Sequence, residues 1–346
     1  MEFQVKVIPV RRSMFRCVLR RLSFLSMLTV FVTTQQAFAD GCTDLGGAVF
    51  SGECILSSPV TKSGAFNVAQ TLRLSGAGAI TVPSATDGNT LTIDVAGDLI
   101  METGTKISGD VTGASAIGAT IVINATDNIL LRGATLLPPL PGATITSNQT
   151  AGSCSGGKGG NITLRADGNI TTENGSELRV DAKCPAGEII TQAGTDIFID
   201  GTVSSKSDQS GTGAMQRPGG GPITIAGACY ATVYDNAFVS SRGSDPGADL
   251  VHIEGGCGVE IFGFVESTIG HIAPNSPATR CGIANRPHAG LSVEPTGCIE
   301  IWSGGSLFID RDTHQGEVST DPIQRGGVGR AWIDIFALGD ISISGP

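Results

Sequence analysis

Five residues in the carboxyl-terminal half combine carboxylates with aromatic rings at matching positions of a repeat. Glu260 and Glu300 lie nine residues after a repeat start, and Tyr234, Phe262 and Trp302 lie eleven residues after one. Carboxyl groups about 5–5.5 Å apart are the pair that retaining glycosidases use. Exposed rings beside carboxylates hold sugars by stacking and by hydrogen bonds to hydroxyls. The spacing predicts a glycan-binding surface of Tyr234, Phe262 and Trp302, with Glu260 and Glu300 as weaker catalytic candidates.

Each interpretation has an alternative. Two outward glutamates can match by chance on stacked repeats, and a raised carboxyl pKa needs burial, which a sequence does not show. A long connection, such as 267–290 or 311–330, would cover the rings and bury them. The acids Asp94, Glu102, Asp196 and Asp200 lie on different repeats without an Arg partner, unlike a lyase calcium site. We therefore expect binding more than catalysis, no metal site and no cofactor.

The elements that position these residues are short apolar segments in pairs. The two segments of a pair begin eight residues apart, and each reads apolar, any residue, apolar. Because strand side chains alternate between two faces, the apolar residues of a segment share one face. The paired starts are Leu72/Ile80, Leu91/Leu99, Ile121/Ile129, Ile162/Ile170, Ile189/Ile197, Ile223/Ala231, Val251/Val259, Leu291/Ile299 and Ile333/Ile341.

Successive pairs begin 19 to 42 residues apart, so the offset within a pair is constant while the connections vary. This is typical of a parallel β-solenoid, in which each coil buries its inward row by stacking on neighbours about 4.8 Å away. An antiparallel sandwich or barrel would explain the alternation but not the recurring offset. The pattern therefore predicts a solenoid of about nine coils.

The composition agrees with a turn-rich β protein. The 346 residues include 49 glycines, with 5% aromatic and 16% charged residues. No Gly-X-Y period occurs, so collagen is excluded. The net charge of −10 argues against a nucleic-acid partner.

The amino-terminal segment has the features of an export signal. Residues 14–39 combine three arginines, an apolar run from Leu22 to Val32, and the ending Ala37-Phe38-Ala39. The alternative, a membrane anchor, needs about 20 apolar residues. We expect cleavage before Asp40, which leaves 16 of the 22 basic and 31 of the 32 acidic residues and a net charge of −15. The mature chain would have no transmembrane segment and would be periplasmic, on the cell surface or secreted.

Eight cysteines remain after the signal, an even number that predicts disulfides in an oxidising compartment. Metal binding is the alternative, but no CxxC pair or paired histidines occur. Cys229 and Cys257 each lie six residues after a repeat start, which puts them within disulfide range. Eight cysteines allow 105 pairings. Proximity in the sequence suggests the others: Cys42 with Cys54, Cys154 with Cys184, and Cys281 with Cys298.

One repeat carries a resemblance to a known group of proteins. Residues 156–170 read GGKGGNITLRADGNI, which resembles the coils of right-handed β-helix passengers related to filamentous haemagglutinin and other bacterial surface exoproteins. The resemblance covers residues 70 to 346. It implies the fold that pectate-lyase-like enzymes share, and a bacterial exported or surface protein such as an adhesin.

We thus expect an all-β, right-handed parallel β-helix with three parts: a cleaved signal at 1–39, a disulfide-bonded cap at 40–70, and the β-helix at 71–346. The expected function is a structural or adhesion module that binds a glycan or a host or cell-surface ligand. The alternative is a polysaccharide lyase or glycoside hydrolase of the same fold. After Gly345-Pro346, we expect further coils or another molecule to cover the last coil, with a frayed terminus as the alternative.

Overall fold

A computed structural model gives the fold of most of the chain. The described residues are 41–84, 88–136, 139–150, 157–207, 220–243, 250–269, 295–310, 317–319 and 330–344. The predicted export signal lies outside these ranges. Within them, no helix has the length and apolar character needed to cross a bilayer.

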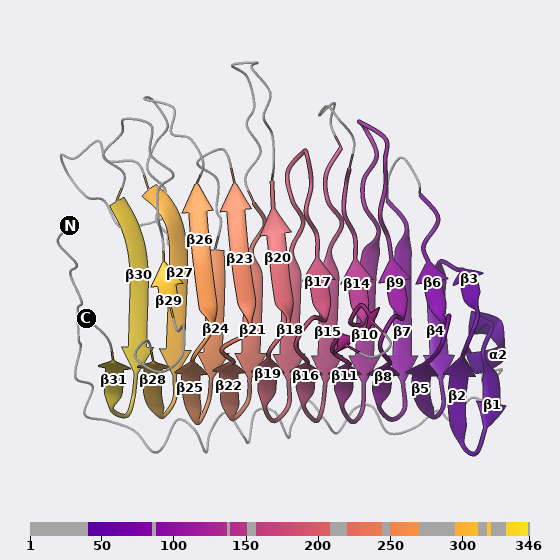
Figure 1. Ribbon diagram of the computed structural model, residues 1–346, viewed down its shortest axis with the longest axis horizontal. Coiled ribbons are helices and arrows are strands. Elements are labelled where there is room, and N and C mark those ends of the chain that lie inside the picture. Colours follow the sequence, from indigo (N-terminus) through magenta and orange to yellow (C-terminus); the bar gives the residue numbers. More distant parts are fainter. Residues whose placement is uncertain are drawn as a thin grey trace, which may run out of the picture.

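Almost all described elements are strands, which lie in three long sheets (Figure 1). Sheet A contains β1 (Ala48–Phe50), β2 (Glu53–Leu56), β5 (Thr71–Leu74), β8 (Leu99–Met101), β11 (Ile129–Leu131), β16 (Ile170–Thr172), β19 (Ile197–Ile199), β22 (Tyr230–Val233), β25 (Gly258–Ile261), β28 (Ser306–Asp310) and β31 (Ile341–Ser344).

The other two long sheets have nine strands each. Sheet B contains β3 (Pro59–Thr61), β6 (Ala79–Thr81), β9 (Lys106–Ser108), β14 (Thr144–Thr146), β17 (Glu177–Arg179), β20 (Thr202–Lys206), β23 (Phe238–Gly243), β26 (Phe264–Ile269) and β29 (Glu317–Ser319). Sheet C contains β4 (Gly64–Val68), β7 (Thr90–Val95), β10 (Thr120–Ala125), β15 (Ile162–Ala166), β18 (Ile189–Ala193), β21 (Ile223–Gly227), β24 (Leu250–Gly255), β27 (Pro295–Ser303) and β30 (Arg330–Ala337).

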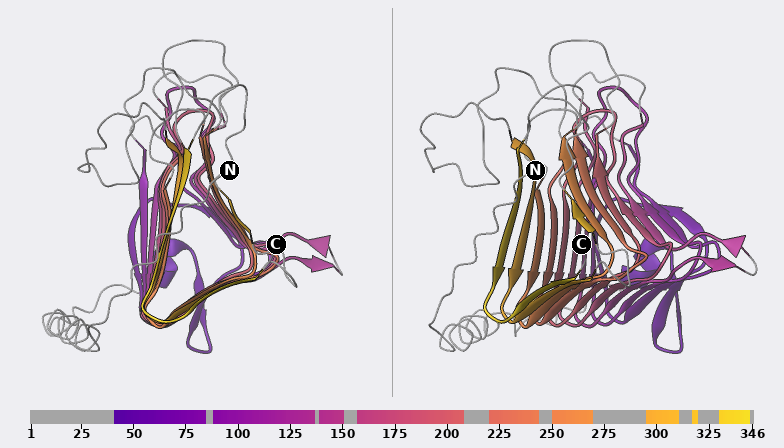
Figure 2. Two further views of the ribbon diagram at one scale, coloured as in Figure 1. Left: turned by 90° about the vertical axis from the view of Figure 1, so that its left-hand side faces the viewer. Right: turned by 60° about the vertical axis from the view of Figure 1, so that its left-hand side comes forward.

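From β2 onward the chain supplies strands to sheets A, B and C in rotation, interrupted by the extra pair β12 and β13. Each strand pairs in parallel with the equivalent strand before and after it, as β10 does with β7 and β15. Viewed along the stack, the three sheets form the sides of a triangle (Figure 2). The all-β class and the parallel pairing predicted from the sequence are therefore confirmed.

The core consists of the inward rows of the three sheets. Ile121, Ile162, Ile189 and Ile223 are in register on sheet C, and each is fully buried. Burying one such side chain stabilises the fold by about 1.5–3 kcal/mol. A side chain of this row is buried only when the neighbouring strands of the sheet stack on both sides of its own strand. The strand register is therefore fixed by apolar packing.

Sheets B and C meet at a corner with little room for side chains. The hydroxyls of the fully buried Ser205 and Ser241 donate to the carbonyls of Gly187 and Gly221, at 2.7 and 2.9 Å. A Cβ at Gly187 would collide with the carbonyl oxygen of Gly160. Small residues at this corner therefore let the two sheets approach each other closely.

The amino-terminal end of the core is covered by α2 (Gly41–Leu45), and the exposed strand β1 pairs antiparallel with β2. Cys42 and Leu45 of α2 are fully buried. Parallel pairing already begins at β2, which lies beside β5.

Two of the predicted disulfides are confirmed. Cys42 bonds Cys54 across 5.5 Å between Cα atoms, and Cys229 bonds Cys257 across 4.4 Å. Cys184 is also disulfide-bonded, while its predicted partner, Cys154, lies outside the described residues. Cys281 lies outside them too, so its predicted bond to Cys298 stays a prediction.

The eight-residue offset is present, but two of the nine predicted pairs are wrong. Leu72 lies on sheet A beside Leu99, and Ile80 lies on sheet B beside Ile107. The equivalent of Leu91 is Gly64, which has no apolar side chain. Because eight residues here also separate sheet A from sheet B, the offset alone does not identify the sheet.

The second wrong pair affects the candidate site. Ile299, predicted as the second member of its pair, lies beside Val251 and is therefore the first. The second member is Leu307, which lies beside Val259. Leu291, Ile299 and Leu307 form a series at intervals of eight residues, and the sequence does not show which two belong together.

Candidate functional site

The outer face of sheet A carries aromatic and acidic side chains in its last strands. Three neighbouring strands and the residues that follow them present three outward positions each: Tyr230, Thr232 and Tyr234 from β22; Gly258, Glu260 and Phe262 from β25; and Ser306, Phe308 and Asp310 from β28. We call this group, together with Phe198 of β19, the aromatic face.

The rings of the aromatic face form two contacting pairs. Phe198 and Tyr234 have ring centroids 6.2 Å apart and planes inclined by 26°, and Phe262 and Phe308 have centroids 5.7 Å apart and planes inclined by 57°. Tyr230 is 45% and Tyr234 39% exposed, and Thr232 is buried among these outward residues. Flat partly exposed rings on a rigid sheet can stack against an apolar ligand surface.

Carboxylates lie among these rings. Glu260 is in register between Thr232 and Phe308. Burial raises the pKa of the Tyr234 hydroxyl, and the carboxylates of Glu260 and Asp200 raise it further. The pKa of Asp200 is also raised, by burial first and by Asp235, against hydrogen bonds from Asn236. The face offers phenol donors and carboxyl oxygen acceptors to hydroxyl-bearing ligands.

The predicted pairing of Glu260 with Glu300 is wrong. Glu260 lies on β25 of sheet A, whereas Glu300 lies on β27 of sheet C, in register with His252. The two residues share no sheet, so the spacing of a retaining glycosidase pair does not arise from their stacking. The cause is the register of the segment after residue 294, where Phe308 occupies the position predicted for Glu300.

The predicted aromatic ladder is also only partly present. Tyr234 and Phe262 follow the paired residues Val233 and Ile261 and lie at equivalent positions of sheet A. Trp302 lies on sheet C beside Glu254. The position next to Phe262 on sheet A, which was predicted for Trp302, is occupied by Asp310. The predicted covering of the rings is incomplete, since Tyr234 and Trp302 are partly exposed.

Trp302 belongs to a second cluster, on the outer face of sheet C. His252 lies between two carboxylates: its Nε2 is 3.5 Å from Oε2 of Glu254, and its Nδ1 is 3.4 Å from Oε2 of Glu300. Hydrogen bonds with Glu254 and Glu300 outweigh burial and raise the pKa of His252 to about 9. The imidazole is therefore a cation at neutral pH and not a free base.

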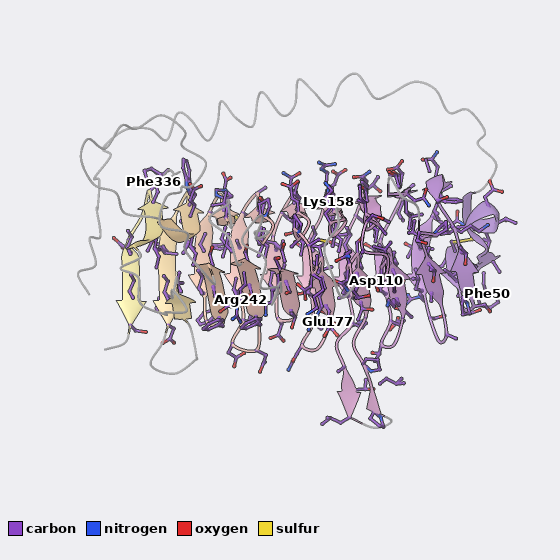
Figure 3. All side chains as sticks on the ribbon, turned by 90° about the horizontal axis from the view of Figure 1, so that it is seen from above. Phe50, Asp110, Lys158, Glu177, Arg242 and Phe336 are labelled. Carbon is purple, nitrogen blue, oxygen red and sulfur yellow. A yellow bond between two sulfur atoms is a disulfide. The ribbon has the colours of Figure 1, made fainter. Side chains whose placement is uncertain are left out.

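Aromatic contacts continue from this histidine along the stack. The Trp302 ring is 6.2 Å from that of His252 and 5.7 Å from that of Phe336, centroid to centroid. Trp302 is 48% exposed. Phe336, labelled in Figure 3, comes from β30. This cluster offers one exposed indole beside Glu254.

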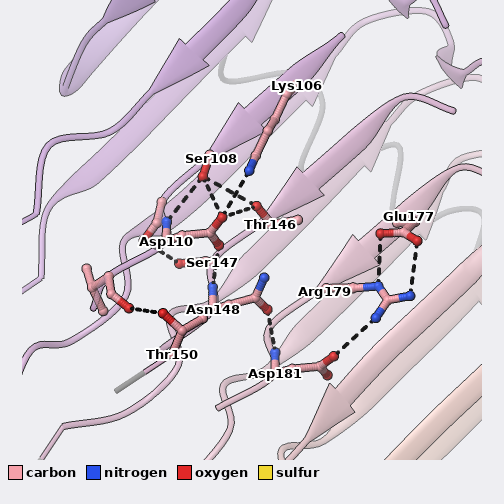
Figure 4. Close-up of polar contacts among 12 residues, drawn as sticks. Lys106, Ser108, Asp110, Thr146, Ser147, Asn148, Thr150, Glu177, Arg179 and Asp181 are labelled. Carbon is pink, nitrogen blue, oxygen red and sulfur yellow. Dashed lines mark hydrogen bonds and ion pairs between the residues drawn. The ribbon is translucent and has the colours of Figure 1, made fainter. Parts of the chain in front are cut away.

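The outer face of sheet B differs, because its polar groups bond to one another (Figure 4). Asp110 accepts hydrogen bonds from Ser108, Thr146 and the backbone N–H of Asn148, at 2.7 to 2.8 Å. Burial alone would raise the pKa of Asp110, but these bonds and nearby Lys106 lower it. The charges of Asp110 and Lys106 are therefore satisfied within this network.

The early strands of sheet A likewise carry paired charges in place of rings. Arg73 binds Glu53 at 2.9 Å and also contacts Glu102, and Arg132 binds Glu173 at 2.7 Å. The aromatic face therefore differs from the rest of its own sheet. Among the residues that the structure describes, no three His, Cys, Asp or Glu side chains are grouped to hold a metal ion.

Three rings of the aromatic face, Phe198, Tyr230 and Phe308, were not predicted as binding residues. Phe308 was missed because of the register after residue 294. Tyr230 could have been found, since it directly follows Cys229 and its neighbour Gly258 directly follows Cys257. Comparisons of the chain with protein-family models, curated proteins and solved structures give no match.

Proposed function

We propose that this protein is an exported right-handed parallel β-helix that serves as a structural or adhesion module and binds glycans through the aromatic face. The observation that carries the proposal is the set of five rings, Phe198, Tyr230, Tyr234, Phe262 and Phe308, on four neighbouring coils. They lie beside carboxylates on a rigid sheet, and sugar rings stack on such surfaces while their hydroxyls donate to carboxylates.

The fold part of the proposal is supported by the rotation of strands among three parallel sheets. Connections between parallel strands of one sheet are right-handed in about 98% of cases. The disulfides support an oxidising compartment. The resemblance of residues 156–170 to haemagglutinin-type passengers favours a surface role. The catalytic alternative loses its main support, because Glu260 and Glu300 lie on different sheets.

The test uses oxidised, folded residues 40–346 and a panel of neutral, amino and acidic polysaccharides. Affinity electrophoresis measures binding, and a reducing-end assay measures cleavage. We expect binding of at least one polysaccharide without new sugar ends. The double variant Tyr234→Ala/Phe308→Ala should bind about tenfold more weakly, since each lost ring contact is worth roughly 0.5–1.5 kcal/mol.

The matched control is Phe238→Ala, which removes a ring from the outer face of sheet B. That ring stacks on Phe264 at 5.1 Å, so its loss should leave glycan binding unchanged. Failure of the folded protein to bind any polysaccharide would contradict the proposal. Release of new sugar ends would instead support the alternative function, a polysaccharide lyase or glycoside hydrolase.

A further inference from the structure

One ring of the aromatic face lies against backbone at the corner between sheets C and A. Tyr230 begins β22, and its register partner is Gly258, the first residue of β25. A Cβ added to Gly258 would lie 2.8 Å from Cε1 and 3.0 Å from Cδ1 of Tyr230. The glycine therefore makes room for the ring to cover the next strand, and 45% of Tyr230 remains exposed.

The backbone beneath this ring is fixed in two ways. The disulfide between Cys229 and Cys257 immediately precedes both register partners. The N–H of Tyr230 donates to Oδ1 of Asp196 at 2.9 Å. A ring held in this way loses little freedom when a ligand stacks on it, and such preorganisation favours affinity.

The charges around this corner are mostly negative. Asp196 precedes β19, Glu254 lies at the end of β24, and Glu260 lies two residues after Gly258. The strands of sheets A and C from β18 to β28 contain no Lys or Arg, and His252 is their one basic residue. A ligand with positive charge complements this surface, and an acidic polymer is repelled.

We propose that Tyr230, lying on Gly258, is a stacking platform for an amino-sugar glycan, whose ammonium groups the surrounding carboxylates attract. This inference rests on the proposed function and specifies its ligand class. The apolar face of the sugar ring packs on the phenol ring, and an ammonium near an aromatic face gains a cation–π contribution. Because the coils repeat along the stack, a linear polymer can contact the corner and the aromatic face together.

The test measures binding of three hexasaccharides by calorimetry: β-1,4-linked glucosamine, its fully N-acetylated counterpart, and galacturonate. The first two share a backbone and differ in charge. We expect the glucosamine hexamer to bind at least tenfold more tightly than the N-acetylated one, with affinity that falls as salt is added, and the galacturonate hexamer not to bind. Equal binding of the first two, or equal binding of hexalysine, would overturn the proposal.

Two variants test the platform itself. Tyr230→Ala removes the ring, and Gly258→Ala displaces it, because the added Cβ meets the far end of a side chain. Each should weaken glucosamine hexamer binding roughly five- to tenfold, while Tyr230→Phe, which keeps the ring, should retain it. Unchanged thermal unfolding shows that the variants fold.

The outcomes separate this inference from the proposed function. If the protein binds a hexamer and both ring variants bind it equally well, the platform is overturned and the glycan-binding function stands. If the folded protein binds none of the three hexamers or the polysaccharide panel, both are overturned.

Discussion

His252 shows how strand register decides the chemistry of single residues. In the sequence, His252 has the features of an ordinary surface residue. In sheet C, however, Glu300 lies directly beside it on the next strand and Glu254 lies two residues further along its own strand. Two carboxylates hold the proton on the imidazole. Glu300, which was predicted as a catalytic candidate, therefore stabilises the His252 cation. Trp302, which was predicted to bind sugar, packs beside His252.

This arrangement predicts a pH dependence of stability. Because the folded pKa of His252 is raised to about 9, its stabilisation is fully present below its unfolded pKa of about 6.5 and is lost as the pH rises through 9. Thermal unfolding should show His252→Gln less stable than the wild type at pH 6, by roughly 1–2 kcal/mol after solvent screening. The difference should shrink above pH 9. A difference that stays constant from pH 6 to 10 would contradict the assigned cation.

For Asp110 we expect the opposite pH dependence of stability. Its folded pKa is lowered, so its stabilisation is present above the unfolded value of about 3.9 and is lost as the pH falls through the lower folded value. Asp110→Asn should lower the free energy of unfolding at pH 7 by about 1–3 kcal/mol, because buried donors lose their acceptor. Urea unfolding at pH 7 and pH 3 measures the effect.

The control for this variant is Asp127→Asn, a change in an exposed turn. It should leave stability within about 0.5 kcal/mol of the wild type. If the two variants lose equal stability at pH 7, then the hydrogen bonds to Asp110 do not stabilise the fold.

At the scale of elements, the strands tolerate long insertions because only their inward rows need to match. The clearest insertion among the described residues is the pair β12 (Thr135–Leu136) and β13 (Pro139–Leu140), which projects from the corner between sheets A and B (Figure 2). These two strands pair only with each other. Leu136 is 90% exposed.

Replacing residues 135–140 by Asn-Gly should therefore change the free energy of unfolding by less than about 0.5 kcal/mol. Urea unfolding measures this change. The comparison is Ile145→Ala, in the fully buried row just after the projection, which should cost about 2–5 kcal/mol. A loss of similar size on shortening the projection would mean that these strands support the core.

The periodicity of the strands explains which parts of the fold could be predicted from the sequence. Inward rows of Ile, Leu and Val recur with one offset, so parallel strands and the bond between Cys229 and Cys257 followed from periodicity. The register after residue 294 did not follow, because three alternating segments share that offset. The aromatic face was found only in part, since it depends on which strand Phe308 joins.

At the scale of the whole molecule, the outer faces of sheets A and B differ in character. Sheet B and the early strands of sheet A carry networks of paired polar groups, as with Asp110 and Arg73. The late strands of sheet A carry rings and carboxylates. The rings of sheet A span four neighbouring strands, whereas on sheet B one ring pair, Phe238 and Phe264, lies beside the polar networks. Local sequence patterns alone do not show this distribution.

The most direct test of the account is an NMR titration of the protein with its Phe and Tyr rings isotopically labelled. The glucosamine hexasaccharide is added, and the aromatic signals of each residue are followed. We predict shifts for Tyr234, Phe262 and Phe308 on the aromatic face, with Phe238 and Phe264 of sheet B unchanged. Shifts confined to Phe238 and Phe264, or none at saturating ligand, would contradict glycan binding at this face.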